Sequence, residues 1–192
     1  MAGRPKIYNE KEALDKAVEV FWEKGYENTS ADDLLKAMGI GKGSFYLAYK
    51  GGKQELFLKS LDRVMDYHIK YFKDKIEQSE FPMQEIRFLF YEMADVQSNL
   101  GKYGCFFVNA LIQIEDEELK RYAIKQLTIL KNIFIKALEA EQKKGNLKTD
   151  LTLNTLGLHL LNLWGGLNVT RKTANSPEEL KLLIELNLQC LQ

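Results

Sequence analysis

Cysteine and histidine are scarce in this sequence of 192 residues, with two of each. Cys105 and Cys190 match no metal-ligand spacing, and the histidines lie far apart in the chain. No glycine-rich nucleotide loop follows a strand pattern, and no His and Cys cluster is present. These absences predict a protein that is not an enzyme and uses no metal or cofactor, and the widely separated cysteines are typical of a reducing compartment.

Long apolar runs are also missing. The most apolar stretch, residues 156–167, is interrupted by His159 and Asn162 and is shorter than the roughly 18 residues that a membrane span requires. The first ten residues are polar rather than apolar like the core of a signal peptide. We therefore expect a cytoplasmic protein that is neither inserted in a membrane nor exported.

Net charge is absent as well, because 27 Lys and Arg residues balance 27 Asp and Glu residues. The charges are unevenly distributed, however. Residues 10–33 carry eight acids and three bases, whereas residues 34–54 carry four lysines and no acid. A local excess of positive charge is typical of a phosphate-binding surface, although four lysines on a solvated face would also be ordinary.

Helical periodicity is what the sequence does contain, over most of its length. Asn9 and Glu12 form a capping pattern before apolar residues at helical spacing, and Gly25 ends that run. The chain is 45% hydrophobic and long enough to bury a core without disulfides. These features predict an all-α fold.

A second capping pattern, Ser30 with Asp33, predicts a helix of two turns that Gly39 closes. Gly41 can then serve as the N-cap of a very short third helix, from Lys42 to about Ala48. Helix, tight glycine turn and short helix together are the layout of a helix-turn-helix.

The short third helix separates into two faces at 3.6 residues per turn. Phe45 and Tyr49 fall on the face that can pack on the first two helices, and they also fit a purely structural role. The outward face carries Lys42, Tyr46 and Leu47. Gly43 lets the first turn approach a ligand closely, and the free N–H groups of that turn favour an anion such as phosphate. This face points to DNA as the partner.

The segment FWEKGYENTSADDLLKAMGIGKGSFYLAYKGGKQELF, residues 21–57, resembles the DNA-binding domain of the TetR family of one-component transcriptional regulators. The Gly-Tyr pair, the Thr-Ser that opens the second helix and the Lys-Gly-Ser-Phe-Tyr of the recognition helix carry the resemblance. The preceding GRPKIYNEKEALDKAVEVF is similar to the arm and first helix of one branch of that family.

The resemblance implies an all-α protein of about nine helices, with an N-terminal helix-turn-helix domain in residues 1–52 and a helical regulatory and dimerisation domain in residues 53–192. It implies a homodimer that binds a double-stranded DNA operator and represses transcription until a small-molecule effector releases it. The DNA-contacting residues would be Arg4, Lys6, Thr29, Ser30, Lys42, Gly43, Ser44, Tyr46, Leu47 and Lys53.

Beyond the DNA-binding segment the sequence predicts a long fourth helix that runs out of the first domain. Further helices are expected from Pro82 to about Gln97, from Cys105, from Asp116, over residues 151–172 and from Ser176. The helix over residues 151–172 is apolar nearly all round, so it needs a second partner. From the residues alone, core burial and a dimer interface are both possible, and the resemblance implies the dimer interface.

An effector site is implied by the resemblance. Candidate side chains near the fourth helix and the later helices are His68, Tyr71, Phe107, Asn109, His159 and Trp164, although each of them also fits a packed core position. Cys105 offers an alternative, since a helix N-terminus would lower its pKa and suit a thiol sensor for oxidants or electrophiles, or it is simply a buried small side chain. A helical protein-binding module without DNA activity would leave the outward face of the third helix without a role.

Overall fold

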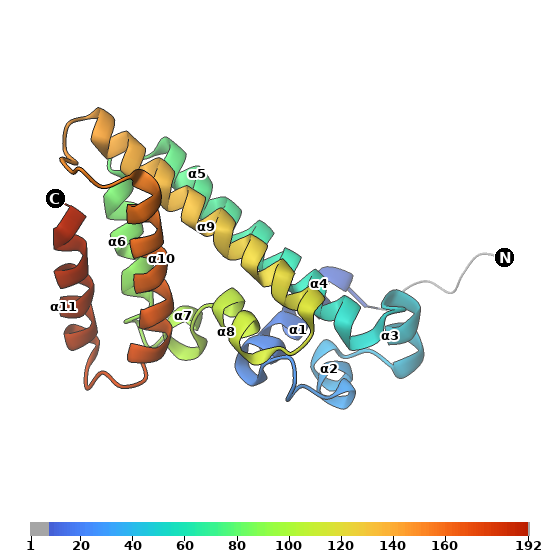
Figure 1. Ribbon diagram of the computed structural model, residues 1–192. Helices are drawn as coiled ribbons and strands as arrows, with labels where there is room; N and C mark the ends of the chain where they lie inside the picture. The colour runs from blue at the N-terminus through green and yellow to red at the C-terminus, as the bar shows by residue number, and fades with distance from the viewer. Residues whose placement is uncertain (1–7, 192) are drawn as a thin grey trace.

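The computed structural model describes residues 8–191, in which every regular element is helical (Figure 1). The helices are α1 (Glu10–Lys24), α2 (Ala31–Met38), α3 (Lys42–Ala48), α4 (Gly52–Val64), α5 (Lys70–Gln78), α6 (Pro82–Glu92), α7 (Asn99–Tyr103), α8 (Phe106–Gln113), α9 (Glu117–Lys143), α10 (Leu153–Thr170) and α11 (Pro177–Leu188). A π-helical turn, η1 (Met65–Ile69), joins α4 to α5, and a 3-10 turn, η2 (Gln189–Leu191), follows α11. The predicted all-α class is confirmed. None of the described helices is both long and apolar enough to cross a membrane.

Local capping interactions begin the first helices where the sequence predicts them. The Asn9 side chain accepts hydrogen bonds from the N–H groups of Lys11 and Glu12 at the start of α1. Ser30 and Asp33 form a reciprocal capping box at the start of α2. These bonds satisfy N–H groups that have no partner inside the helix, so each helix begins at its cap.

The N-terminal helices share a core with the first part of α4. Helix α1 packs against both α2 and α4, and the Phe21 and Phe57 rings meet edge to face with centroids 4.9 Å apart. Phe45 and Tyr49 are buried in the same core and hold α3 against it. The predicted boundary between residues 52 and 53 lies at the start of α4, and the division into two domains stays a prediction.

The remaining helices form an elongated body beyond the N-terminal helices. The continuous helix α4–η1–α5 and helix α9 run side by side along it (Figure 1). Helix α8 packs between α4 and α9, α6 packs on α5 and α9, and α10 and α11 form the far flank. Counting α4–η1–α5 as one helix, the described residues contain the nine predicted helices and also α7.

The segment between α6 and α8 differs from the prediction. Helix α6 ends at Glu92 instead of Gln97, and the chain then forms α7, which the sequence analysis did not predict. Ser98 caps α7 by accepting a hydrogen bond of 2.8 Å from the N–H of Gly101. Gly104 ends α7 at φ +78°, and a Cβ atom there would lie 2.1 Å from Oδ1 of Asn168. Glycine is therefore required where α7 meets α10.

Candidate nucleic-acid interface and internal cavity

Helix α3 presents the predicted outward face to solvent. The side chains of Lys42, Ser44, Tyr46 and Leu47 are exposed, and that of Leu47 is 77% exposed. Gly43 lies between them with nothing within 4 Å of a Cβ placed there. The N-cap of α3 is Gly41, which supplies no side-chain hydrogen bond. The first turn is thus thin, positively charged and open to a large ligand.

The lysines around α3 have different roles. Lys36, Lys42 and Lys50 are exposed, whereas the Nζ of Lys53 donates to the carbonyl oxygens of Tyr26, at 2.9 Å, and Thr29, at 3.1 Å. Its ammonium group also lies over the Tyr26 ring, 4.3 Å from the centroid. Lys53 therefore fastens the α1–α2 loop to the start of α4. Its predicted phosphate contact stays a prediction.

The start of α2 differs from the prediction for one residue. The Thr29 side chain is buried, and its hydroxyl donates to the Gly25 carbonyl at 2.6 Å, so it holds the α1–α2 loop and does not face outward. Ser30 is exposed beside it. Hydrogen bonds from Lys24 and Ser30 lower the pKa of Asp33 far below its usual value. Arg4 and Lys6, also predicted to contact DNA, lie outside the described residues.

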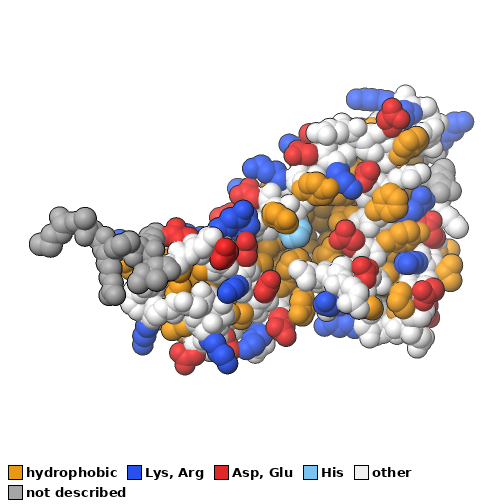
Figure 2. All heavy atoms as spheres, turned by 180° about the vertical axis from the view of Figure 1, so that it is seen from behind, with side chains coloured by type: hydrophobic (Ala, Val, Ile, Leu, Met, Phe, Trp, Pro, Cys, Tyr) orange, Lys and Arg blue, Asp and Glu red, His pale blue; other side chains and the backbone are white. Residues whose placement is uncertain are grey.

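A cavity of about 480 Å³ opens between α5, α6, α8 and α10. Its walls are mostly hydrophobic, and Figure 2 shows a hollow on this face edged by hydrophobic side chains. The volume is within the range of small-molecule sites in proteins. Four of the six predicted effector-site residues line it: His68, Tyr71, Phe107 and Trp164.

Asn109 and His159 are not among the lining residues of this cavity, and their contact with an effector stays a prediction. The Asn109 amide donates to the Tyr103 carbonyl at 2.7 Å and accepts a hydrogen bond from Asn168 at 2.8 Å. The His159 imidazole lies 3.3 Å from the Asn187 carbonyl oxygen on α11. Both side chains join neighbouring helices, because a partly buried polar group takes the nearest protein partner.

Trp22 is a lining residue that the sequence analysis missed, and it belongs to α1 of the N-terminal helices. Its indole N–H donates a buried hydrogen bond of 2.7 Å to the Gly104 carbonyl oxygen. Its ring lies edge to face with the His68 imidazole, with centroids 5.9 Å apart. Trp22 therefore links the helix-turn-helix region, the π-turn and the loop that leads into α8.

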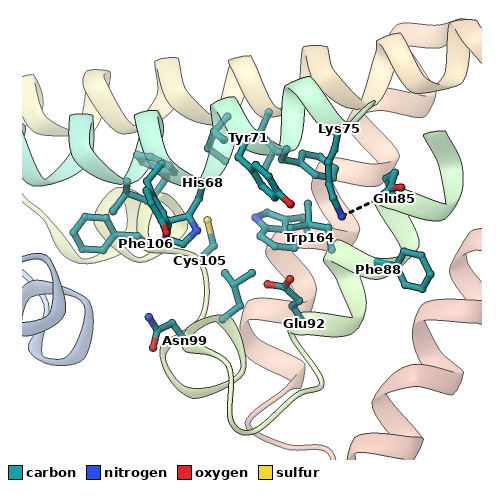
Figure 3. A pocket seen from close by; sticks show the side chains of 18 of the residues that line it. His68, Tyr71, Lys75, Glu85, Phe88, Glu92, Asn99, Cys105, Phe106 and Trp164 are labelled. Carbon is teal, nitrogen blue, oxygen red and sulfur yellow. Dashed lines mark hydrogen bonds and ion pairs between the residues drawn. The ribbon is translucent and has the colours of Figure 1, made fainter. Parts of the chain in front are cut away.

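Charged groups stand among the aromatic walls. Figure 3 shows Lys75 and Glu85 joined across the cavity, with an ion-pair distance of 3.2 Å, and Glu92 pointing inward from α6. Partial burial raises the pKa of Glu92, although its side chain still reaches solvent. Desolvation, with the positive charge of Arg63, lowers the pKa of His68, although part of its imidazole still reaches solvent at the cavity mouth. The buried indole N–H of Trp164 has no oxygen or nitrogen acceptor among the described residues and faces only the Cys105 sulfur, a weak acceptor.

Cys105 also lines the cavity, as the N-cap of α8, but the predicted effect on its pKa was wrong. Its side chain is buried, and burial raises the pKa of the thiol above its usual value. Desolvation disfavours a thiolate more than the start of the helix favours it. The chemistry of Cys105 in this structure is therefore that of a protonated, packed side chain and not of a reactive thiolate.

The outer surface of α10 and α11 is apolar. Its exposed hydrophobic side chains are Leu158 and Val169 on α10 and Leu182 and Leu186 on α11. Gly165 and Gly166, near the end of α10, have open space where a Cβ would stand. These four side chains, the apolar stripe of α10 and α11, remain exposed in the single chain, and large exposed apolar groups that gather on a surface are typical of an interaction site.

Comparison with known proteins agrees with this geometry. Residues 13–59 match the sequence profile of bacterial regulatory proteins, tetR family. The chain is 28% identical to the uncharacterised HTH-type transcriptional regulator YezE of Bacillus subtilis, over 98% of this chain and 99% of YezE. It is 33% identical to the HTH-type transcriptional repressor ComR of Escherichia coli, over 56% of this chain and 51% of ComR. A cysteine mutant of the regulator CifR, solved with 26-base-pair operator DNA, is 25% identical with a TM-score of 0.84, covering 99% of this chain and 100% of CifR.

Proposed function

The chain belongs to the TetR family of bacterial transcriptional regulators, and we propose that it is a homodimeric repressor that a small molecule releases from a near-palindromic operator. The observation that carries the proposal is Trp22, a residue of the first DNA-binding helix that also forms part of the cavity wall. Because the operator is chromosomal DNA, such a repressor works in the cytoplasm. ComR, which is similar over about half of both chains, is itself a repressor.

The DNA-binding step rests on the outward face of α3. CifR, whose structure has the same fold, binds operator DNA, and the exposed Lys42, Gly43, Ser44, Tyr46 and Leu47 form the matching surface here. Lys42 can donate to a guanine edge or to a phosphate, and Leu47 can contact a thymine methyl group in the major groove. Arg4 and Lys6 would add contacts from the N-terminal arm, and Ser30 and Lys53 would contact the DNA backbone.

The dimer step rests on the apolar stripe of α10 and α11. Two copies related by a twofold axis would bury Leu158, Val169, Leu182 and Leu186, and the glycines of α10 would allow the helices a close approach. We expect Leu182→Glu to dissociate the dimer in sedimentation, because it places a charge in that contact. Ile112→Glu, on exposed Ile112 of α8, is the matched control and leaves the dimer intact.

The regulatory step couples the cavity to the DNA-binding helices. A ligand that contacts Trp22 and His68 alters the packing between α1, the π-turn and the loop after α7. It releases DNA only if it binds better to an arrangement in which the two recognition helices are wrongly spaced. A coupling free energy of about 1 to 3 kcal/mol would weaken DNA binding by about 5 to 150-fold when the effector saturates its site. By linkage, bound DNA would weaken the affinity for the effector by the same factor.

The test begins with selection of binding sites from random duplex DNA, followed by affinity measurements at several salt concentrations. Contacts to about four to eight phosphates predict a log–log salt slope of roughly −4 to −7. The selected site should be a near-palindrome with half-sites about one helical turn, or a multiple of it, apart. Lys148→Ala, an exposed lysine on the α9–α10 loop, is the control for lysine loss. A salt slope near zero, or a selection that enriches no sequence, would refute the proposal that the protein binds operator DNA.

A further inference from the structure

The cavity lining contains two carboxylates, Glu85 and Glu92, but only one lysine, Lys75. Lys75 is paired with Glu85, while the described residues contain no ion pair or hydrogen bond to the Glu92 carboxylate. His68 has its pKa lowered below the usual value of about 6.5, so it adds no full positive charge at neutral pH. With Glu92 ionised, the lining groups together carry one net negative charge.

Two positive groups near the cavity, Arg63 and Lys75, already have acidic partners. Arg63 forms a two-pronged contact with Asp15, with its Nε 2.5 Å from Oδ1, and its guanidinium covers one face of Tyr67. Lys75 lies over the Tyr71 ring as well as beside Glu85. A bound anion would have to break one of these pairs, whereas a bound cation would find Glu92 free of such a partner.

Aromatic rings surround this charge. Eight of the nineteen lining residues are aromatic: Trp22, Tyr67, Tyr71, Phe72, Phe88, Phe106, Phe107 and Trp164. Tyr67, Tyr71 and Phe88 are more than half exposed, so parts of these rings remain open to a ligand. Aromatic faces attract cations through their quadrupole, and the attraction grows when the cation is desolvated. In the view of Figure 3, Trp164 lies between Tyr71 above it and the Glu92 carboxylate below it.

From the unpaired Glu92 carboxylate, the occupied cations and the aromatic walls, we propose that the cavity selects lipophilic organic cations. The proposal rests on the cavity being the effector site, and it names the chemical class of that effector. The apolar body of the ligand packs between the rings, and its positive centre lies near Glu92. Partial burial raises the pKa of that carboxyl more than the positive charge of Lys75 lowers it, and a cationic ligand would bring a second positive charge beside it.

The experiment uses two probes of matched shape and opposite charge, tetraphenylphosphonium and tetraphenylborate. The chain has two tryptophans, Trp22 and Trp164, and both line the cavity, so tryptophan fluorescence reports its occupancy directly. Titration of the full-length protein without DNA should show the phosphonium binding at least about tenfold more tightly than the borate. Equal affinity, or tighter binding of the borate, would overturn the proposal.

Two variants test the role of Glu92, because one is expected to weaken phosphonium binding and the other to strengthen it. Glu92→Gln should weaken phosphonium binding by about three- to tenfold, while Glu139→Gln, which changes an exposed acid of α9, leaves it unchanged. Lys75→Met frees Glu85 and should strengthen phosphonium binding by a similar factor. If Glu92→Gln leaves the preference for the cation intact, the proposal is wrong.

Operator release is measured separately, so that this proposal and the proposed function can fail independently. Phosphonium that binds in the cavity without changing operator affinity supports the cation class and contradicts regulation through the cavity. Release by neutral or anionic compounds, with no binding of the phosphonium, supports regulation and contradicts the cation class.

Discussion

Two buried tryptophans allow the hydrogen bond between the N-terminal helices and the α7–α8 loop to be measured. Trp22 donates its indole N–H to the Gly104 carbonyl oxygen at 2.7 Å, whereas the indole N–H of Trp164 has no oxygen or nitrogen acceptor in the described residues and faces only the Cys105 sulfur, a weak acceptor. Both rings are almost fully buried and both contact another aromatic ring. Trp22→Phe and Trp164→Phe therefore remove similar apolar volume, and only Trp22→Phe removes a hydrogen bond to a carbonyl oxygen.

The difference between the two variants estimates that bond. Loss of a buried hydrogen-bond partner leaves the Gly104 carbonyl without this donor, which costs about 1 to 3 kcal/mol. For a chain of this length that cost lowers Tm by roughly 2 to 12 °C more for Trp22→Phe than for Trp164→Phe. Thermal unfolding at one fixed protein concentration compares them, because dimerisation makes Tm concentration-dependent. Equal losses of stability would show that the Trp22 bond contributes nothing, and the link between α1 and the α7–α8 loop would lose its basis.

Three further predictions follow from single residues. Lys42→Ala should cost about 1 to 3 kcal/mol of operator affinity and relax the preference at one base pair per half-site, and an unchanged selected sequence would assign Lys42 to the DNA backbone instead. Gly157→Ala should destabilise the protein by about 1 to 3 kcal/mol in urea unfolding, because the added Cβ would lie 2.5 Å from Cγ1 of Ile135 on α9, and unchanged stability would mean that the two helices separate easily. The lowered pKa of His68 means that the folded state binds a proton at this residue less readily than the unfolded chain does. The contribution of His68 to the free energy of unfolding is therefore fully present above about pH 6.5 and is lost as the pH falls through the lower folded-state pKa. Unfolding measured from pH 8 to pH 5 should show a shallower decline for His68→Gln, and an identical profile would contradict the assignment.

The sequence predicts the helices well wherever a local interaction defines them. Asn9, Ser30, Asp116 and Ser176 all cap helices where the pattern predicts, because the bonding partner lies two or three residues away. Phe45 and Tyr49 are buried and Tyr46 is exposed, as helical spacing predicts. Short helix α7 has too few residues to show a periodic pattern.

The cavity was only partly predictable, because its walls come from distant parts of the chain. Trp22 reads as one more apolar residue of α1, and only the packing of α8 and the π-turn around it makes it a lining residue. Asn109 and His159 lie outside the cavity walls, since the sequence does not reveal which backbone carbonyl a polar side chain will reach. The raised pKa of Cys105 has the same origin, because burial depends on the whole fold.

The π-turn η1 changes the spacing of the buried residues along the continuous helix α4–η1–α5. Val64 and Phe72, the nearest buried residues on either side of it, are eight positions apart, where an uninterrupted α-helix would return to the same face after about seven. The turn absorbs one extra residue and restores the phase, so that both ends of this long helix face the body of the molecule. Deleting one residue from Met65–Ile69 would therefore act at a distance, since it would rotate α5 by about 100° and take Phe72 and Ile76 out of the core while leaving the DNA-binding end of α4 in place.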